Sequence, residues 1–139
     1  MKISLTKEFS FEMAHALKNY DGACKNIHGH SYRLFVTVSG EPISDKNSPK
    51  YGMIMDFGDL KQIVNTYIVN RFDHALVLNE EHEFGEIADT KTVLTLFQPT
   101  CENLLVHFAG LIEPHLPKGV RLTKLKMHET ATSFAELKL

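Results

Sequence analysis

Residues 31–40 read SYRLFVTVSG, and polar and apolar side chains alternate along them. This alternation, rich in β-branched and aromatic residues, is typical of a strand with one buried face. Residues 3–14 alternate in the same way, except that residues 6–8 are polar and predict an irregularity or bulge. A loop that includes residues 18–27 separates the two segments. We therefore expect an antiparallel hairpin.

Two helices are expected further along the chain. Apolar residues recur every three or four positions from Phe57 or Asp59 to Arg71, and a second apolar stripe spans residues 101–113. Thr100 is a natural N-cap for the second helix. Further strand-like segments are residues 92–97, 120–128 and 133–139. The order predicts an α+β fold, with one sheet covered on one face by two helices.

The composition limits the function classes. The chain has 139 residues, 43% of them hydrophobic, and a formal charge of -2. This length predicts one domain spanning residues 1–139. Without a basic stripe or a long apolar run, we expect neither a nucleic-acid partner nor a membrane. No signal peptide is apparent, so the chain is expected in the cytoplasm with Cys24 and Cys101 as free thiols.

Three histidines form the clearest candidate site. His28 and His30 flank Gly29 at the start of the second predicted strand, and period-two geometry sends both rings to one face. His15 ends the preceding strand and would join them if the strands pair. Three nitrogen ligands leave one zinc position open, which is the mark of a catalytic site. Cys24 could be a fourth ligand that closes the site or a free thiolate, and spacing does not separate these alternatives.

Other polar residues have weaker signals. Asp73 and His74 are adjacent after the first helix, which suggests either a carboxylate-tuned histidine or a histidine at a helix C-terminus. Glu102 suits the positive end of the second helix dipole, and Glu129 lies in a turn where carboxylates are usually solvated. Cys101 is interpreted as a packing residue. The remaining histidines are interpreted as surface or packing residues: His82, His107, His115 and His128.

Taken together, several motifs resemble the 6-pyruvoyltetrahydropterin synthase and 6-carboxytetrahydropterin synthase family. They are Phe11-Glu12-Met13-Ala14-His15, Cys24-Lys25-Asn26-Ile27-His28-Gly29-His30-Ser31-Tyr32, Met55-Asp56-Phe57 with Leu60-Lys61, Asp73-His74-Ala75-Leu76 with Leu78-Asn79, Pro99-Thr100-Cys101-Glu102-Asn103 and Glu129-Thr130. The resemblance spans almost the whole chain. The polar residues 79–91 have no clear counterpart, and Cys101 stands where a small residue such as alanine is expected.

The resemblance implies the tunnelling fold, an antiparallel four-stranded sheet with two helices on one face. Its subunits join their sheets into a barrel, commonly as a homohexamer of two trimers. The resemblance also implies Zn2+ as the cofactor. It assigns zinc ligation to His15, His28 and His30, the general base to Cys24, a proton relay from a neighbouring subunit to Asp73 and His74, and pterin binding to Glu129 with Thr100 and Glu102 nearby.

The implied substrate is 7,8-dihydroneopterin triphosphate. The spacing from Cys24 to His28, the short chain and Ser31 favour the bacterial 6-carboxytetrahydropterin branch of queuosine and deazapurine biosynthesis, a lyase that also releases acetaldehyde and triphosphate. The alternative is the 6-pyruvoyl enzyme, which eliminates triphosphate without cleaving the side chain. Two lower-ranked hypotheses are a hydrolase with Cys24 as nucleophile and His74 as base, and a non-catalytic zinc- or pterin-binding protein.

Overall fold

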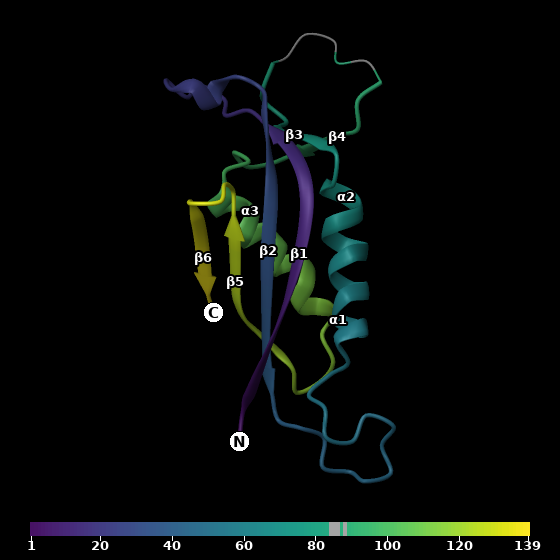
Figure 1. The fold of residues 1–139 in the computed structure, drawn as a ribbon. Coiled ribbons are helices and arrows are strands. Elements are labelled where there is room, and N and C mark those ends of the chain that lie inside the picture. The colour runs from purple at the N-terminus through teal and green to yellow at the C-terminus, as the bar shows by residue number, and fades with distance from the viewer. Residues whose placement is uncertain (84–86, 88) are drawn as a thin grey trace.

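A computed structural model describes residues 1–83, 87 and 89–139. Its centre is a ribbon of two long antiparallel strands, β1 (Ile3–His15) and β2 (His28–Gly40), which runs the length of the molecule in Figure 1. At the C-terminal end of the chain, β5 (Arg121–His128) pairs with β2, and β6 (Phe134–Lys138) pairs with β5. The predicted hairpin of β1 and β2 is therefore confirmed, and the last two strands form a second antiparallel pair.

The prediction of four antiparallel strands is wrong. The structure has a six-stranded mixed sheet in the order β4-β3-β1-β2-β5-β6. Strand β3 (Ala75–Asn79) pairs in parallel with the end of β1, and β4 (Thr92–Thr95) pairs in parallel with β3. Residues 75–78 are all buried, and such a short apolar run lacks the alternation that identifies a half-exposed strand.

The bulge predicted at residues 6–8 is also absent, because β1 and β2 keep one register along their whole length. Thr6 and Glu8 lie on the exposed face, where Thr6 contacts Thr37 and Glu8 accepts a 2.7 Å hydrogen bond from Arg33. Their polarity reflects solvent exposure rather than a break in the strand. The register shift lies instead between Thr37 and Val38, where β2 pairs with β5.

Two helical segments cover one face of the sheet, as predicted. The first runs through α1 (Phe57–Val64), a π-helical turn η2 (Asn65–Val69) and α2 (Asn70–Phe72). The second is α3 (Cys101–Ile112), followed by the 3-10 turn η3 (Glu113–His115). No helix in the described residues is both long enough and apolar enough to cross a membrane.

Local capping explains where the helices begin. The Asp56 carboxylate accepts a hydrogen bond from the Gly58 amide, and the Thr100 hydroxyl accepts one from the Asn103 amide. The N-cap predicted at Thr100 is confirmed.

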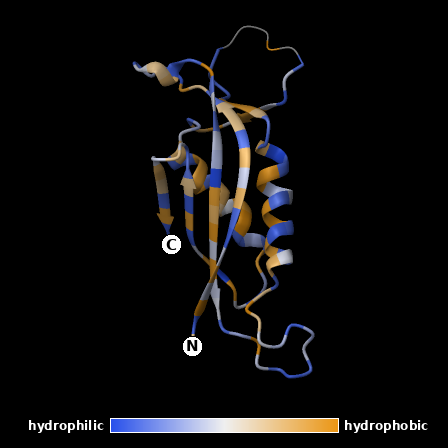
Figure 2. Cartoon of the chain, viewed as in Figure 1, coloured by the Kyte–Doolittle hydropathy of each residue, from blue (hydrophilic) through white to orange (hydrophobic). Residues whose placement is uncertain are grey.

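The core lies between the helices and the inner face of the sheet. Phe108 of α3 packs edge-on against Phe11 of β1 and Phe72 of α2. Figure 2 shows hydrophobic and hydrophilic residues alternating along the strands, which leaves the other face of the sheet polar. The hydrophobic face fixes the register of β1 and β2, and that register places the candidate site.

Candidate metal centre and its surroundings

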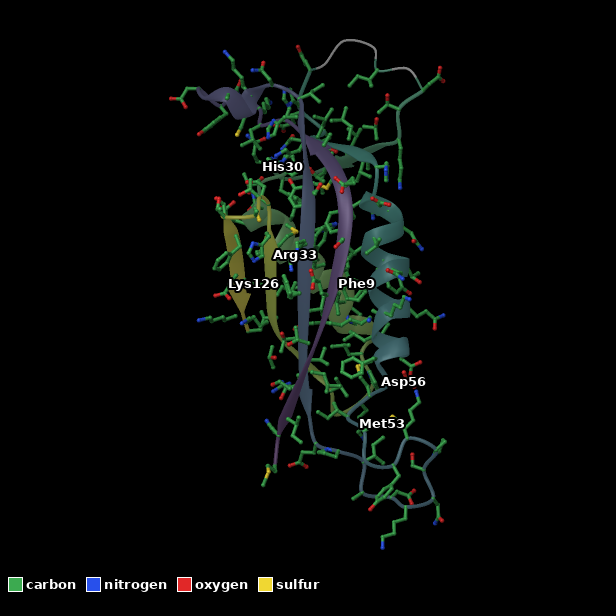
Figure 3. All side chains as sticks on the ribbon, in the orientation of Figure 1. Phe9, His30, Arg33, Met53, Asp56 and Lys126 are labelled. Carbon is green, nitrogen blue, oxygen red and sulfur yellow. The ribbon has the colours of Figure 1, made fainter. Side chains whose placement is uncertain are left out.

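The three predicted histidines converge at one end of the β1–β2 ribbon. His15 lies directly opposite His28, and His30 lies opposite Met13, so strand alternation brings all three rings to the helix side. One ligand atom from each lies within 4.8 Å of the others. Figure 3 labels His30 at this end of the ribbon, far from Asp56 at the other. The predicted clustering is confirmed.

Hydrogen bonds to carbonyl groups select the histidine tautomers. His15 Nδ1 lies 2.7 Å from the Pro99 carbonyl oxygen, and His28 Nδ1 lies 2.7 Å from that of Asn26. A carbonyl oxygen only accepts, so each Nδ1 must donate, and each Nε2 of a neutral ring then carries a lone pair. These two Nε2 atoms face each other at 3.0 Å. Two lone pairs that face each other repel unless a cation lies between them. A metal ion bound by both Nε2 atoms would therefore stabilise this arrangement.

His30 completes the donor set. Its Nε2 is buried and has no hydrogen-bond partner among the described residues. Burial lowers the pKa of both His15 and His30, so these rings are neutral at neutral pH and able to donate lone pairs. Glu129 Oε1 opposes this effect from 3.5 Å and 3.6 Å away from their Nε2 atoms. Three imidazoles beside one carboxylate fit Zn2+.

Cys24 lies outside the histidine cluster. It sits in a short 3-10 turn, η1 (Ala23–Lys25), within the connection from β1 to β2, and its side chain is partly exposed as a free thiol. Among the described residues, the group that could hold a metal contains three histidines and not Cys24. This arrangement is compatible with the alternative in which Cys24 is not a zinc ligand and zinc keeps an open coordination position.

Asp73 and His74 contact each other and lie outside the group of described residues that could hold a metal. Asp73 Oδ1 lies 3.0 Å from His74 Nδ1 and accepts a 2.9 Å hydrogen bond from the Glu12 amide. The hydrogen bond from Glu12 is the main reason why the pKa of Asp73 is lowered, and His74 adds to it. His74 is 76% exposed and lines a cavity of about 370 Å³ together with Glu12 and Ser31. Those two side chains alternate with the ligands and point away from the helices, and His30 also lines this cavity.

The predicted pterin-binding residues gather beside the cluster. Glu129 and Glu102 line a cavity of about 130 Å³ with Cys101 and Ser133, whereas Thr100 serves as the cap of α3. Cys101 is buried, and burial raises the pKa of its thiol to about 12. The packing role predicted for Cys101 agrees with this environment.

Two further residues of the site were missed by sequence reasoning. Tyr32 is fully buried behind the histidines, with its ring centroid 5.5 Å from that of His30, and its hydroxyl has no hydrogen-bond partner among the described residues. Burial raises the pKa of Tyr32, and the nearby Glu129 carboxylate adds to the rise. Gln98 holds the loop that carries Cys24. Alternation marks Tyr32 as inward-facing, but no local signal identifies the contact made by Gln98.

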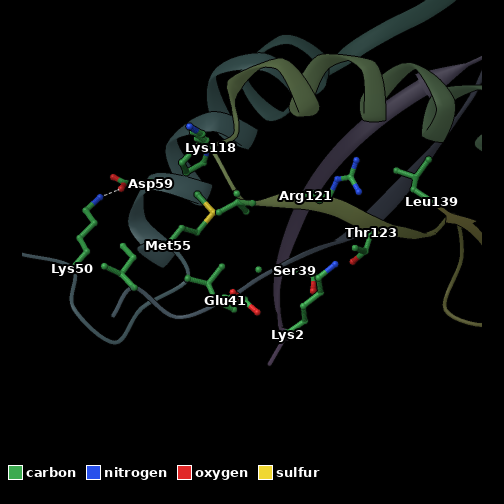
Figure 4. A pocket seen from close by; sticks show the side chains of 16 residues that line it. Lys2, Ser39, Glu41, Lys50, Met55, Asp59, Lys118, Arg121, Thr123 and Leu139 are labelled. Atoms are coloured by element: carbon green, nitrogen blue, oxygen red, sulfur yellow. Dashed lines mark hydrogen bonds and ion pairs between the residues drawn. The ribbon is translucent and has the colours of Figure 1, made fainter. Parts of the chain in front are cut away.

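A larger cavity of about 670 Å³ lies at the far end of the ribbon (Figure 4). Ser39 and Gly40, at the end of β2, contribute to its wall, and Lys50 pairs with Asp59 beside it. None of the described residues that line it is a histidine or a cysteine. Among the described residues, the group that could hold a metal therefore lies at the opposite end of the ribbon.

Comparison with known proteins gives consistent results. The sequence profile described as 6-pyruvoyl tetrahydropterin synthase matches residues 4–139. Proteins named 6-carboxy-5,6,7,8-tetrahydropterin synthase are similar to the chain: that of Haemophilus influenzae is 35% identical, covering 95% of this chain and 96% of its own length. The Synechocystis protein of the same name is 36% identical, covering 93% of this chain and 88% of its own length.

Solved structures share the fold. An uncharacterized protein from Wolinella succinogenes has a TM-score of 0.81 at 18% identity, covering 99% of this chain and 98% of its own. The 6-pyruvoyl tetrahydropterin synthase of Caenorhabditis elegans has a TM-score of 0.70 at 24% identity, covering 100% of this chain and 96% of its own.

Proposed function

Because the chain belongs to the 6-pyruvoyl tetrahydropterin synthase family, we propose that it is a zinc-dependent lyase that converts 7,8-dihydroneopterin triphosphate to 6-carboxy-5,6,7,8-tetrahydropterin, acetaldehyde and triphosphate. The names of relatives at 29–36% identity support the 6-carboxy product. One observation carries the metal dependence: the Nε2 atoms of His15 and His28 face each other with both Nδ1 atoms bound to carbonyl oxygens.

Each group of site residues has its own proposed role in the reaction. His15, His28 and His30 would hold Zn2+, which supplies Lewis-acid polarisation of a substrate oxygen when bound. Cys24 acts as the base that removes a carbon-bound proton. Glu129 binds the pterin, because its two carboxylate oxygens accept from neighbouring N–H donors in one plane, and Thr100 and Glu102 lie near the ring.

Asp73 and His74 act as a relay on a second copy of the chain. Within one chain, His74 lines an open cavity with Glu12 and Ser31, whose side chains alternate with the histidine ligands, and Cys24 does not line that cavity. In an oligomer, the relay of one copy can instead act at the site that contains Cys24 of another copy. We therefore propose a homo-oligomer, a hexamer of two trimers, in which sheets join into a barrel. A cytoplasmic location and a place in queuosine biosynthesis remain predictions.

Product analysis tests the proposal directly. Zinc-loaded protein is incubated with 7,8-dihydroneopterin triphosphate, and the products are identified by mass spectrometry. We expect 6-carboxytetrahydropterin and acetaldehyde, with no turnover by His15→Asn and a kcat at least about 100-fold lower for Cys24→Ala. Absence of any product from the zinc-loaded wild-type protein would refute the proposal.

The 6-pyruvoyl product is the second candidate, favoured by the family profile that matches residues 4–139. The same assay separates the two activities, because 6-pyruvoyltetrahydropterin would form as the final product without acetaldehyde. Turnover lost on metal removal while the fold stays intact would exclude a purely structural role of the metal.

A further inference from the structure

The loop between β1 and β2 is held by a side chain from a distant part of the sequence. Gln98 Oε1 accepts a 3.1 Å hydrogen bond from the Lys18 amide, and Gln98 Nε2 donates a 2.8 Å hydrogen bond to the Lys18 carbonyl oxygen. Both bonds are partly buried. The Gln98 side-chain amide thus pairs with both the N–H and the carbonyl oxygen of Lys18. Only a side chain that carries both a donor and an acceptor can do this.

Gln98 is itself fixed beside the metal centre. Its backbone carbonyl accepts a 3.0 Å hydrogen bond from the Asn103 side chain on α3. The next residue, Pro99, supplies the carbonyl oxygen that contacts His15 Nδ1. One short segment therefore positions both a proposed zinc ligand and the loop that contains Cys24.

The Lys18 contact reaches Cys24 through the loop backbone. The Leu17 amide donates a 2.9 Å hydrogen bond to the Cys24 carbonyl oxygen, so the residue next to Lys18 is tied to the proposed base. On the other side of Cys24, the Asn26 carbonyl contacts His28 Nδ1. Cys24 is thus held between two anchors, and the Gln98 contact provides one of them.

We propose that Gln98 is a positioning residue for the Cys24 base: its side-chain amide pairs with the Lys18 backbone and thereby fixes the thiol relative to the histidine cluster. This inference rests on the proposed function. The Lys18 ammonium, 3.4 Å from an exposed Glu81 carboxylate, does not replace the contact, because a surface ion pair orders a side chain and not the loop backbone.

Two variants of the zinc-loaded protein test the proposal. Gln98→Glu keeps the size but places an acceptor against the Lys18 carbonyl, and Gln98→Leu removes both hydrogen bonds. Gln62→Glu, on the exposed surface of α1, is the control for the charge change. Steady-state kinetics, bound zinc, far-ultraviolet circular dichroism and the rate of Cys24 alkylation by iodoacetamide are measured for each.

We expect both Gln98 variants to lower kcat by about 10- to 100-fold, because a misplaced reacting group loses much of the benefit of orientation. KM and zinc content should stay close to those of the wild type. Cys24 should be alkylated several-fold faster, since a loop released from its anchor opens more often, while the buried Cys101 stays unmodified. Destabilisation of the whole fold would expose Cys101 as well, so faster alkylation confined to Cys24 together with slower turnover identifies a change in the Cys24 loop. Gln62→Glu should match the wild type.

Unchanged kcat and alkylation in both variants would overturn the proposal. So would a loss of activity that follows a loss of zinc, because Gln98 would then act on His15 through Pro99. If Gln98→Leu does not fold, the kcat and alkylation rate of Gln98→Glu alone test the proposal. A wild-type protein without turnover would refute the proposed function, whereas the alkylation rates would still test whether Gln98 holds the loop.

Discussion

The two faces of the β1–β2 ribbon differ sharply at its histidine end, although neighbouring residues supply them. On the helix side, His30 Nε2 and the Tyr32 hydroxyl are buried without hydrogen-bond partners among the described residues. On the open side, Ser31 donates a 2.7 Å hydrogen bond to Glu12, and Asp73 accepts one from the Glu12 amide. Unpartnered buried polar groups are rare in structural cores, and the donor set that includes His30 fits a metal ion.

The contrast indicates that each face of the ribbon supplies a different part of an active site. The helix side has a nearly complete donor set within one chain. The open side has a relay pair that is solvent-exposed and lacks the reactive groups it would serve. Each prediction below tests this division.

The largest expected effect is recovery of activity from two inactive variants. Cys24→Ala lacks the base and His74→Ala lacks the relay, so each alone should lose at least about 100-fold in kcat. If the relay serves another copy, refolding the two variants together in equal amounts should restore about a quarter of wild-type activity. An intact Cys24 is present at half of the sites and an intact His74 at half, and random mixing brings the two together at about a quarter of them. Activity is measured before and after mixing. A mixture no more active than its components would place the relay and the base in the same chain.

A smaller effect is expected for the two neighbouring hydroxyl groups, with opposite signs. Tyr32→Phe removes a buried hydroxyl that has no hydrogen-bond partner within the described part of the chain, and it should raise the free energy of unfolding by about 1 kcal/mol. Ser31→Ala removes a satisfied, exposed hydrogen bond and should lower it by about 0.5 kcal/mol. Urea denaturation of the metal-free protein measures both. Equal destabilisation by the two substitutions would contradict the distinction between the faces.

The smallest effect concerns the pH dependence of the open face. The pKa of Asp73 is lower in the folded chain, so the carboxylate stabilises the fold above its unfolded pKa, and this contribution is lost as the pH falls through the folded value. Asp73→Asn should therefore lower the free energy of unfolding by about 0.5 kcal/mol at pH 7, a small value because the side chain is exposed. The difference from wild type should vanish in acid.

Urea denaturation at pH 7 and at pH 3 measures the Asp73 effect, with Asp21→Asn as the control at an exposed position of the Cys24 loop. A difference between Asp73→Asn and wild type that is as large at pH 3 as at pH 7 would show that Asp73 does not act through its charge.

The histidine cluster could be predicted from the sequence because its geometry is local. Period-two alternation aligns His28 with His30, and a single antiparallel pairing adds His15. The N-cap at Thr100 was equally accessible, since it depends on residues within one turn.

The missed features depend on contacts between distant segments. Strand β3 pairs in parallel, and its buried residues show no alternation. Gln98 and Pro99 act on residues about eighty positions away, and nothing near them in the sequence identifies those partners. The placement of His74 follows from its position after α2 and from the pairing of β3 with β1, neither of which is apparent in the motif.

The order of contacts around His15 also bears on how the chain folds. All three candidate ligands lie in residues 15–30, on one hairpin, whereas the carbonyl oxygen that sets the His15 tautomer comes from Pro99. Hairpins form in about 1–10 μs, and contacts that close long loops form more slowly. The hairpin can therefore gather its imidazoles before α3 has docked, and a metal ion captured at that stage would act as a nucleus for the remainder of the sheet.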